Sequence, residues 1–307
     1  MTSESQNRPD ARGLSRGGTE ERSARRTRRA RPTAAVVFLA AFAAVYLLAV
    51  CTPAGQRAEN SLVVGYADQA RVFAMSESVG LPPLTAEYAT IGAGIALIAL
   101  VALVRRRWRE GGAAVGVVVV SLVGAEALRS VLPRPDLVHA PSQLTEVSFP
   151  SGHVAIAAGL ALGAALVASP RTRPYVVAAG ALWLAVTAGG VQALYWHRPS
   201  DALGATLLAC ACYALATRLL PPTARSSRPG AGSRSRVLPA VALAVAALGA
   251  VLGSAREDAV ARPLVFAAAA FACALLIWWT AVRSDARTAV RSDVKSAGRR
   301  EAPRLRG

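Results

Sequence analysis

Two of the three histidines in this 307-residue chain stand at spacings that suit nucleophilic and acid–base chemistry. His197 and Asp201 are at positions i and i+4, so on a helix the carboxylate lies one turn from the imidazole. Such a carboxylate fixes the tautomer of the ring and raises the nucleophilicity of its other nitrogen. His153 opens a separate apolar stretch, where it could act as an acid and then as a base. The third histidine, His139, fits neither pattern.

The residues just before His153 predict the start of a helix that can bind an anion. Pro150 and Ser151 are helix-start residues, and Gly152 lets a ligand approach the backbone closely. The unpaired N–H groups of the first turn and the positive end of the helix dipole favour a phosphate group. Upstream, the rigid turn at 132–136 presents the guanidinium of Arg134, which we expect on the same face of the protein.

The elements that must position these residues are predicted to be membrane helices. The chain is 53% hydrophobic and only 17% charged, with a mean hydropathy of +0.38, which excludes intrinsic disorder and argues against an ordinary soluble domain. A helix needs about 20 mostly apolar residues to cross a bilayer. Eight stretches meet or nearly meet this requirement: 33–52, 88–104, 111–128, 151–169, 175–194, 201–218, 238–253 and 264–282.

The basic residues predict the orientation of these helices. With the N-terminus in the cytoplasm, 28 of the 35 Lys and Arg residues fall on the cytoplasmic side and seven fall outside. Eight crossings return the C-terminus to the cytoplasm, and all three histidines then lie on the external side. A net charge of +17 would otherwise suggest nucleic acid, but these arginines flank apolar stretches, so membrane topology explains them and no nucleic-acid partner is expected.

The motifs resemble those of the type 2 phosphatidic acid phosphatase superfamily, which includes lipid phosphatases, sugar phosphatases and vanadium haloperoxidases. The family pattern is Lys-x6-Arg-Pro, then Pro-Ser-Gly-His, then Ser-Arg-x5-His-x3-Asp. This chain is similar at 134–135, at 150–153, and at His197 and Asp201. The resemblance covers about residues 35–220. It implies an all-α, polytopic transmembrane helix bundle with a six-helix phosphatase core, to which the last two apolar stretches add two C-terminal helices.

Two family cations are absent from their expected positions. Ala127 stands where the family has its lysine, and Val191 stands where it has its arginine. Arg129 could replace the lysine if the loop is two residues shorter, and Arg198 is the nearest spare guanidinium beside His197. The sequence does not decide whether either one reaches the phosphate.

The resemblance implies a reaction that passes through a phosphohistidine. His197 would attack phosphorus, Asp201 would orient it, and His153 would protonate the leaving group and then activate water. No metal or other cofactor is implied, because the external loops lack the carboxylate cluster that a Mg²⁺ site needs. The groups expected to bind the phosphate share a positive charge or a backbone N–H: Arg134, Arg129, Arg198, Ser151 and Gly152.

The predicted function is therefore a metal-independent phosphatase at the external face of the plasma membrane, with both termini in the cytoplasm. Its partner would be a lipid phosphate or pyrophosphate in the bilayer, such as undecaprenyl pyrophosphate, phosphatidic acid or phosphatidylglycerol phosphate. Two alternatives remain: a relative that binds lipid phosphates without turnover, and a phosphotransferase that uses the same histidine. A transporter is disfavoured because the charges lie only at the ends of the spans.

The predicted organisation has five parts. A phosphatase-like membrane core at 33–220 is followed by a cytoplasmic linker at 221–236 and by two additional transmembrane helices at 237–282. Disordered basic cytoplasmic tails at 1–32 and 283–307 complete the chain. Within the core, Glu126 is expected to pair with Arg129 or Arg134, and Gly159-x3-Gly163 is expected to form a close helix contact.

Overall fold

The computed structural model describes residues 32–63, 82–220 and 264–282, and throughout these ranges the only regular elements are helices. Seven of the eight predicted apolar stretches are helical, with ends that differ by a few residues from the prediction. The eighth, at 238–253, lies outside the described residues, as do the linker, the whole tail 283–307 and residues 1–31 of the N-terminal tail. The elements are α2 Pro32–Val45, η1 Tyr46–Val50, α3 Pro53–Val63, α5 Glu87–Val104, α6 Trp108–Val131, α7 Ser142–Thr145, α8 Gly152–Val167, α9 Arg173–Ala193, α10 Pro199–Leu219 and an unlabelled helix Leu264–Val282.

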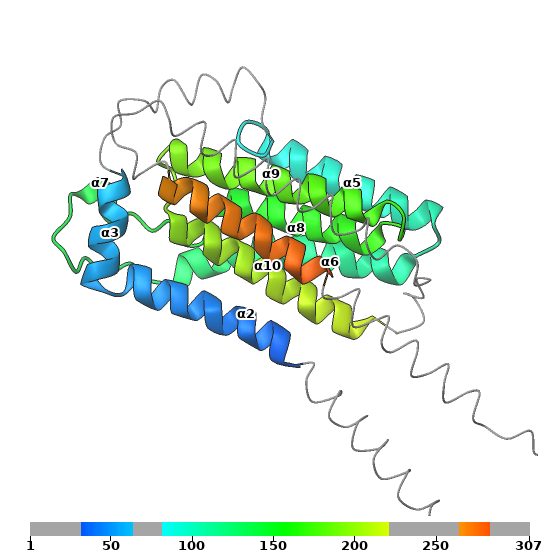
Figure 1. The fold of residues 1–307 in the computed structure, drawn as a ribbon, viewed down its shortest axis with the longest axis horizontal. Helices are drawn as coiled ribbons and strands as arrows, with labels where there is room; N and C mark the ends of the chain where they lie inside the picture. The colour runs from blue at the N-terminus through cyan, green and yellow to red at the C-terminus, as the bar shows by residue number, and fades with distance from the viewer. Residues whose placement is uncertain (1–31, 64–81, 221–263, 283–307) are drawn as a thin grey trace, which may run out of the picture.

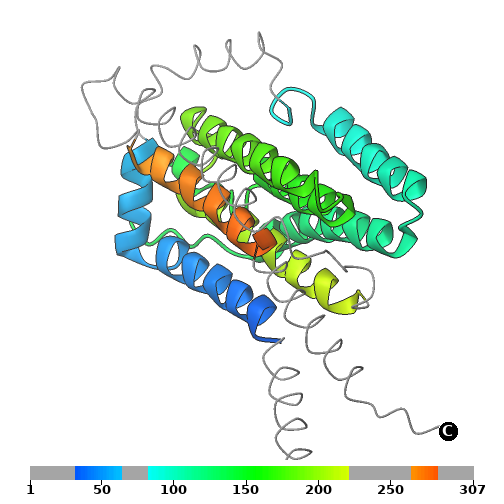
Figure 2. The ribbon, with the colours of Figure 1, turned by 45° about the vertical axis from the view of Figure 1, so that its right-hand side comes forward.

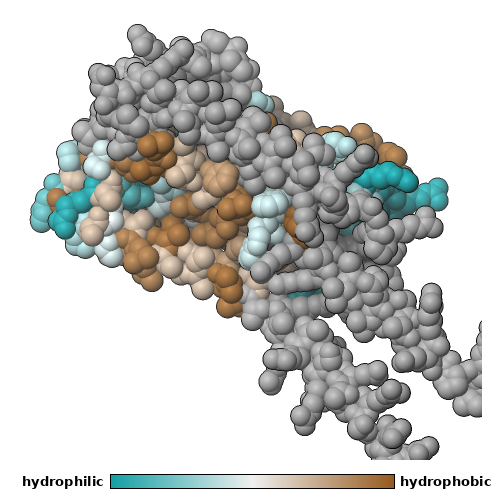
Figure 3. All heavy atoms as spheres, in the orientation of Figure 1, coloured by the Kyte–Doolittle hydropathy of each residue, from teal (hydrophilic) through white to brown (hydrophobic). Residues whose placement is uncertain are grey.

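The helices form a multi-pass membrane bundle. Five described helices, α5, α6, α9, α10 and Leu264–Val282, are long and apolar enough to span a membrane, and α8 is a shorter apolar helix. The long helices run side by side, and α3 and α7 lie together at one end, which we name the α3 end (Figure 1). On the face shown in Figure 3, hydrophobic side chains cover the flank of the bundle, while hydrophilic ones gather at its two ends. This distribution matches a hydrocarbon belt between two polar interfaces.

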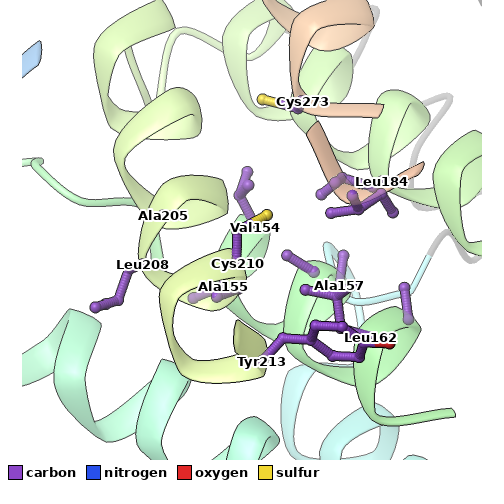
Figure 4. Packing of buried hydrophobic residues seen from close by; sticks show 14 of the residues in the cluster. Val154, Ala155, Ala157, Leu162, Leu184, Ala205, Leu208, Cys210, Tyr213 and Cys273 are labelled. Atoms are coloured by element: carbon purple, nitrogen blue, oxygen red, sulfur yellow. The ribbon is translucent and has the colours of Figure 1, made fainter. Parts of the chain in front are cut away.

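Helix α8 is the centre of the bundle and packs against α5, α6, α9 and α10. Its small side chains allow close approach. A Cβ added at Gly163 would lie 3.1 Å from the Ala114 carbonyl oxygen, and one at Gly159 would lie 3.3 Å from the Val118 Cα. The predicted Gly159-x3-Gly163 contact is confirmed, and its partner is α6. Figure 4 shows the surrounding core, where Val154, Ala157 and Leu162 of α8 lie among side chains of α9, α10 and the helix Leu264–Val282.

The helix Leu264–Val282 lies against α9 and α10, where it is drawn in orange (Figure 2). Its Phe266 ring packs edge-on against the Tyr195 ring that follows α9, with centroids 6.4 Å apart. Its Trp279 ring meets Phe38 of α2 with centroids 6.1 Å apart. These contacts join the C-terminal helix to both sides of the six-helix part of the bundle.

Helix α3 was not predicted from the sequence. It follows η1 after a bend of 77°, and its 11 residues are too few and too polar to span a membrane by themselves. Its buried face carries Gln56, Glu59, Asn60 and Val63, at positions i, i+3, i+4 and i+7. A helix that buries three polar side chains needs polar neighbours. Those neighbours are the candidate site residues at the α3 end.

Candidate active site

His197 and Asp201 form the hydrogen-bonded pair that their spacing predicts. His197 Nδ1 lies 3.3 Å from Asp201 Oδ2, and the same oxygen accepts the Arg198 backbone N–H at 2.9 Å. Asp201 is completely buried and His197 is 8% exposed. The carboxylate is therefore held at the start of α10 by the backbone. With the proton on Nδ1, that nitrogen donates to Asp201, and Nε2 keeps its lone pair for a substrate.

His153 lies opposite His197 because the starts of α8 and α10 are joined. Ser151 caps α8, with its Oγ accepting the Val154 N–H at 3.4 Å, and its own N–H donates to the Asp201 carbonyl at 3.1 Å. The His153 and His197 ring centroids are 6.2 Å apart. This separation leaves room for a phosphoryl group to contact both rings.

Phe149 anchors the segment that leads into α8. Its buried ring packs against Phe42 and Tyr46, with centroids 5.1 and 5.4 Å apart. On the other side it presses on α10 at Gly204, where an added Cβ would lie 2.5 Å from the ring. The absence of a side chain at Gly204 thus lets the aromatic anchor lie directly against the backbone of α10.

Arg129 reaches the start of α8 from the last turn of α6. Its Nη2 atom is 3.8 Å from the position that a Cβ on Gly152 would occupy. Arg129 also forms an ion pair with Glu126, one of the two pairings that the sequence predicts for this glutamate. The structure therefore places a guanidinium at the positive end of α8, two residues along the chain from Ala127.

Arg134 lies in the loop after α6 with part of its hydrogen-bonding capacity unused. Its Nη2 donates to Asn60 Oδ1 at 3.3 Å, whereas its buried Nη1 has no hydrogen-bond partner among the described residues. Burial lowers the pKa of Arg134, and the nearby charge of Arg198 lowers it further, while Asp201 and Glu59 oppose that shift. The guanidinium of Arg134 thus lies near the start of α10, and its Nη1 can donate hydrogen bonds to an anion.

Arg198 is bound mainly by the protein. Its Nη1 donates to Ser148 Oγ at 2.9 Å, and its Nη2 donates to the Leu144 carbonyl at 2.7 Å and to Asn60 Oδ1 at 3.4 Å. These bonds tie the start of α10 to α7, to the segment between α7 and α8, and to α3. His139, which the sequence does not assign to the site, is exposed in the loop before α7.

The two positions that lack the family cations are apolar in structure as well as in sequence. Val191 is fully buried in the last turn of α9, and its carbonyl accepts the Trp196 and His197 N–H groups at 3.0 and 3.2 Å. Ala127 is exposed on α6. Neither position brings a charge to the histidines.

The residues that α3 contributes were not predicted from the sequence. Gln56 Nε2 donates to the Pro135 carbonyl at 2.5 Å, and Glu59 Oε1 accepts the Ser200 N–H at 3.1 Å. Asn60 binds both Arg134 and Arg198. A signal was available, since three polar residues at i, i+3 and i+4 between two spans can share one helix face.

The composition of the site agrees with a match to a known family. The family model of the PAP2 superfamily matches residues 112–225. This stretch of the chain is similar to the PAP2 superfamily. The PAP2 stretch begins in α6 and includes α8, α9 and α10, hence His153, His197 and Asp201, but it leaves out α2, α3 and α5. The match is thus narrower than the range of about 35–220 that the motifs suggested.

Members of the PAP2 superfamily are generally phosphatases, so the match supports phosphoester hydrolysis and, with the membrane helices, a lipid phosphate as substrate. Comparisons with curated proteins and with solved structures found no match. Among the described residues, no three His, Cys, Asp or Glu side chains come together in a way that could hold a metal ion.

Proposed function

We propose that the protein is a metal-independent membrane phosphatase that hydrolyses a lipid phosphate or pyrophosphate through a phosphohistidine intermediate. The observation that carries the proposal is the geometry of three residues. His197 is hydrogen-bonded to the buried Asp201, and the His153 ring lies across from it with centroids 6.2 Å apart. The first turn of α8 and the guanidinium of Arg129 lie beside them.

In the first step, His197 Nε2 attacks phosphorus, and the bond from phosphorus to the leaving oxygen breaks. His153, protonated once the anionic substrate is bound beside it, gives its proton to that oxygen, so the leaving group departs as an alcohol or a protonated phosphate. The Nδ1–H of His197 stays bonded to Asp201, whose negative charge stabilises the positive ring of the phosphohistidine.

In the second step, the now neutral His153 takes a proton from water as the water oxygen attacks phosphorus. The bond between phosphorus and Nε2 breaks, and its electron pair returns to His197. Inorganic phosphate leaves, and His153 is again protonated for the next turnover. Each histidine therefore ends the cycle in the state in which it began.

Charge on the phosphoryl oxygens would be stabilised by Arg129, Arg134 and the first-turn N–H groups of α8, including that of Gly152. Ser151 contributes differently, because its N–H already donates to Asp201 and its hydroxyl caps α8. Arg198 is the least available of the proposed ligands, since both of its terminal nitrogens have protein acceptors.

The same proposal places the site at the external face of the plasma membrane. The excess of basic residues on the opposite side supports this orientation, with both termini in the cytoplasm. A lipid substrate could keep its tail in the bilayer while its phosphate enters from the headgroup level. Undecaprenyl pyrophosphate, phosphatidic acid and phosphatidylglycerol phosphate are candidate substrates of this kind.

The test is phosphate release by detergent-purified protein in the presence of EDTA, with a panel of lipid mono- and diphosphates. His197→Ala should abolish release, and His139→Ala, which alters an exposed loop histidine, should leave it unchanged. Release that survives EDTA and depends on His197 supports the proposal. Release that persists in His197→Ala, or that requires added metal, contradicts it.

A further inference from the structure

The buried face of α3 is polar and is bonded to the segments that carry the site. Gln56, Glu59 and Asn60 are 2%, 7% and 8% exposed. Burying polar side chains is unfavourable unless they are hydrogen-bonded. Because this face is polar, α3 is held in place mainly by the hydrogen bonds of these three side chains rather than by apolar burial.

Gln56 fixes the backbone on both sides of Asp136. Its Nε2 donates to the Pro135 carbonyl at 2.5 Å, and its Oε1 accepts the Leu137 N–H at 3.2 Å. The same Nε2 donates to the Val50 carbonyl at 2.8 Å, at the end of η1. The loop that presents Arg134 is therefore held to the beginning of α3 through a single side chain.

Asn60 joins two guanidinium groups through one oxygen. Its Oδ1 accepts Arg134 Nη2 at 3.3 Å and Arg198 Nη2 at 3.4 Å. Two guanidiniums this close repel each other, and the charge of Arg198 lowers the pKa of Arg134. A carbonyl oxygen has two lone pairs, so it can hold both groups without neutralising either of them.

Glu59 holds α3 against the start of α10. Its Oε1 accepts the Ser200 N–H at 3.1 Å, while its Oε2 is buried and has no hydrogen-bond partner among the described residues. Burial raises the pKa of Glu59, and the negative charge of Asp201 raises it further. Through its bond to Ser200, Glu59 therefore fixes the position of Asn60 relative to Arg198. Glu59 itself does not form an ion pair with Arg198.

We infer that Asn60 is a positioning residue for phosphate binding, which keeps Arg134 beside Arg198 as a paired positive charge. The inference rests on the proposed function and identifies α3, outside the PAP2 stretch, as a working part of the site. The neutral acceptor is the essential feature. It sets the geometry of the two arginines and leaves their charge for the anionic substrate.

The test compares Asn60→Asp with Ala58→Asp in the full-length, detergent-purified protein. Both add one carboxylate to α3, but Ala58 lies on its exposed face. The aspartate at position 60 can keep both hydrogen bonds while neutralising charge. We expect the Kd for inorganic phosphate, measured by calorimetry, to rise about tenfold or more in Asn60→Asp, and by less than twofold in Ala58→Asp.

If Asn60 positions the two arginines, Asn60→Asp should weaken phosphate binding without lowering stability, whereas a purely structural role would lower both. The unfolding temperature of Asn60→Asp should equal or exceed that of the native protein, and the KM for a hydrolysed lipid phosphate should rise more than kcat falls. Equal phosphate affinity in the two variants would overturn the inference. So would a loss of affinity that Asn60→Asp shares equally with Asn60→Ala and that follows a fall in unfolding temperature.

The two proposals can fail separately. If the native protein releases no phosphate from any lipid, the proposed phosphatase function fails, and the calorimetric comparison alone decides the role of Asn60. If the native protein hydrolyses a lipid but Asn60→Asp binds phosphate as the native protein does, only the positioning role fails.

Discussion

Helices α8 and α3 are both packed against the site, yet they bury opposite kinds of surface. Of the 16 residues in α8, 13 are buried, and all 13 are Ala, Val, Leu, Ile or Gly. Helix α3 has 11 residues and buries Gln56, Glu59, Asn60 and Val63. The first helix is held by close apolar packing and the second by specific hydrogen bonds.

The difference shows how the work of the site is divided between the two helices. Helix α8 provides a rigid backbone whose first turn meets His197 through the bond from Ser151 to Asp201. Helix α3 provides no apolar platform, and instead fixes side chains and loops that come from elsewhere. Rigid positioning of the histidines should thus depend on packing, whereas positioning of the arginines should depend on hydrogen bonds.

The largest effect is expected at Asp201, which interacts both with the start of α8 and with α3. Its carbonyl accepts the Ser151 N–H of the α8 cap, and its charge acts on Glu59 of α3. Asp201→Asn can keep the bond from the Arg198 N–H but loses the charge that stabilises the His197 ring. We expect kcat to fall by about 10³-fold or more, with an unchanged unfolding temperature. A loss of less than tenfold in steady-state assays would contradict the assigned role.

Overpacking α8 should come next and should act on stability. Gly163→Leu forces a side chain into a site where even a Cβ would lie 3.1 Å from the Ala114 carbonyl, whereas a Cβ added at Gly116 on α6, the position of the control Gly116→Leu, would meet nothing within 4 Å. We expect the first change to destabilise the protein by about 2–3 kcal/mol and the second by less than about 0.5 kcal/mol. Thermal unfolding in detergent measures both. Equal stability of the two variants would remove the contrast between packed and open glycines.

Substitutions at Arg129 and at Arg198 should distinguish a loss of activity alone from a loss of activity and stability together. Arg129→Gln removes the guanidinium beside Gly152, and we expect kcat/KM to fall by about 10²-fold with little change in unfolding temperature. Arg198→Gln removes a group with three protein acceptors, so it should lower the unfolding temperature as well as activity. Steady-state kinetics and thermal unfolding of both variants make the comparison. The same ratio of activity loss to stability loss in both would argue against this division.

The smallest effect is expected at Glu126. This exposed carboxylate pairs with Arg129 and so competes with a substrate phosphate for the guanidinium. Glu126→Gln should lower the KM for the lipid phosphate by about two- to threefold, as expected for an exposed ion pair, and should leave kcat unchanged. The KM measured at low and at high salt provides the check, because screening should reduce the difference. A raised KM would instead show that Glu126 assists Arg129.

Much of the fold could be predicted because membrane helices are specified locally. Apolar stretches predicted α5, α6, α8, α9, α10 and the helix Leu264–Val282 to within a few residues. Helix α3 escaped because its buried face is polar, and hydropathy recognises only burial in lipid or in an apolar core. A buried polar face can be recognised only when the hydrogen-bond partners of its side chains are known.

The candidate site, like the fold, could be predicted from the sequence only where its contacts are local. The sequence alone determined the pairing of His197 with Asp201, because a spacing of four residues at a helix start places them one turn apart. It also determined that α8 begins at the Ser151 cap. Only the tertiary structure decided that Arg129 reaches Gly152, that Arg198 binds the segment before α8, and that Asn60 lies between two arginines. Those contacts join residues up to 138 positions apart, and their geometry depends on how the helices pack rather than on any local spacing.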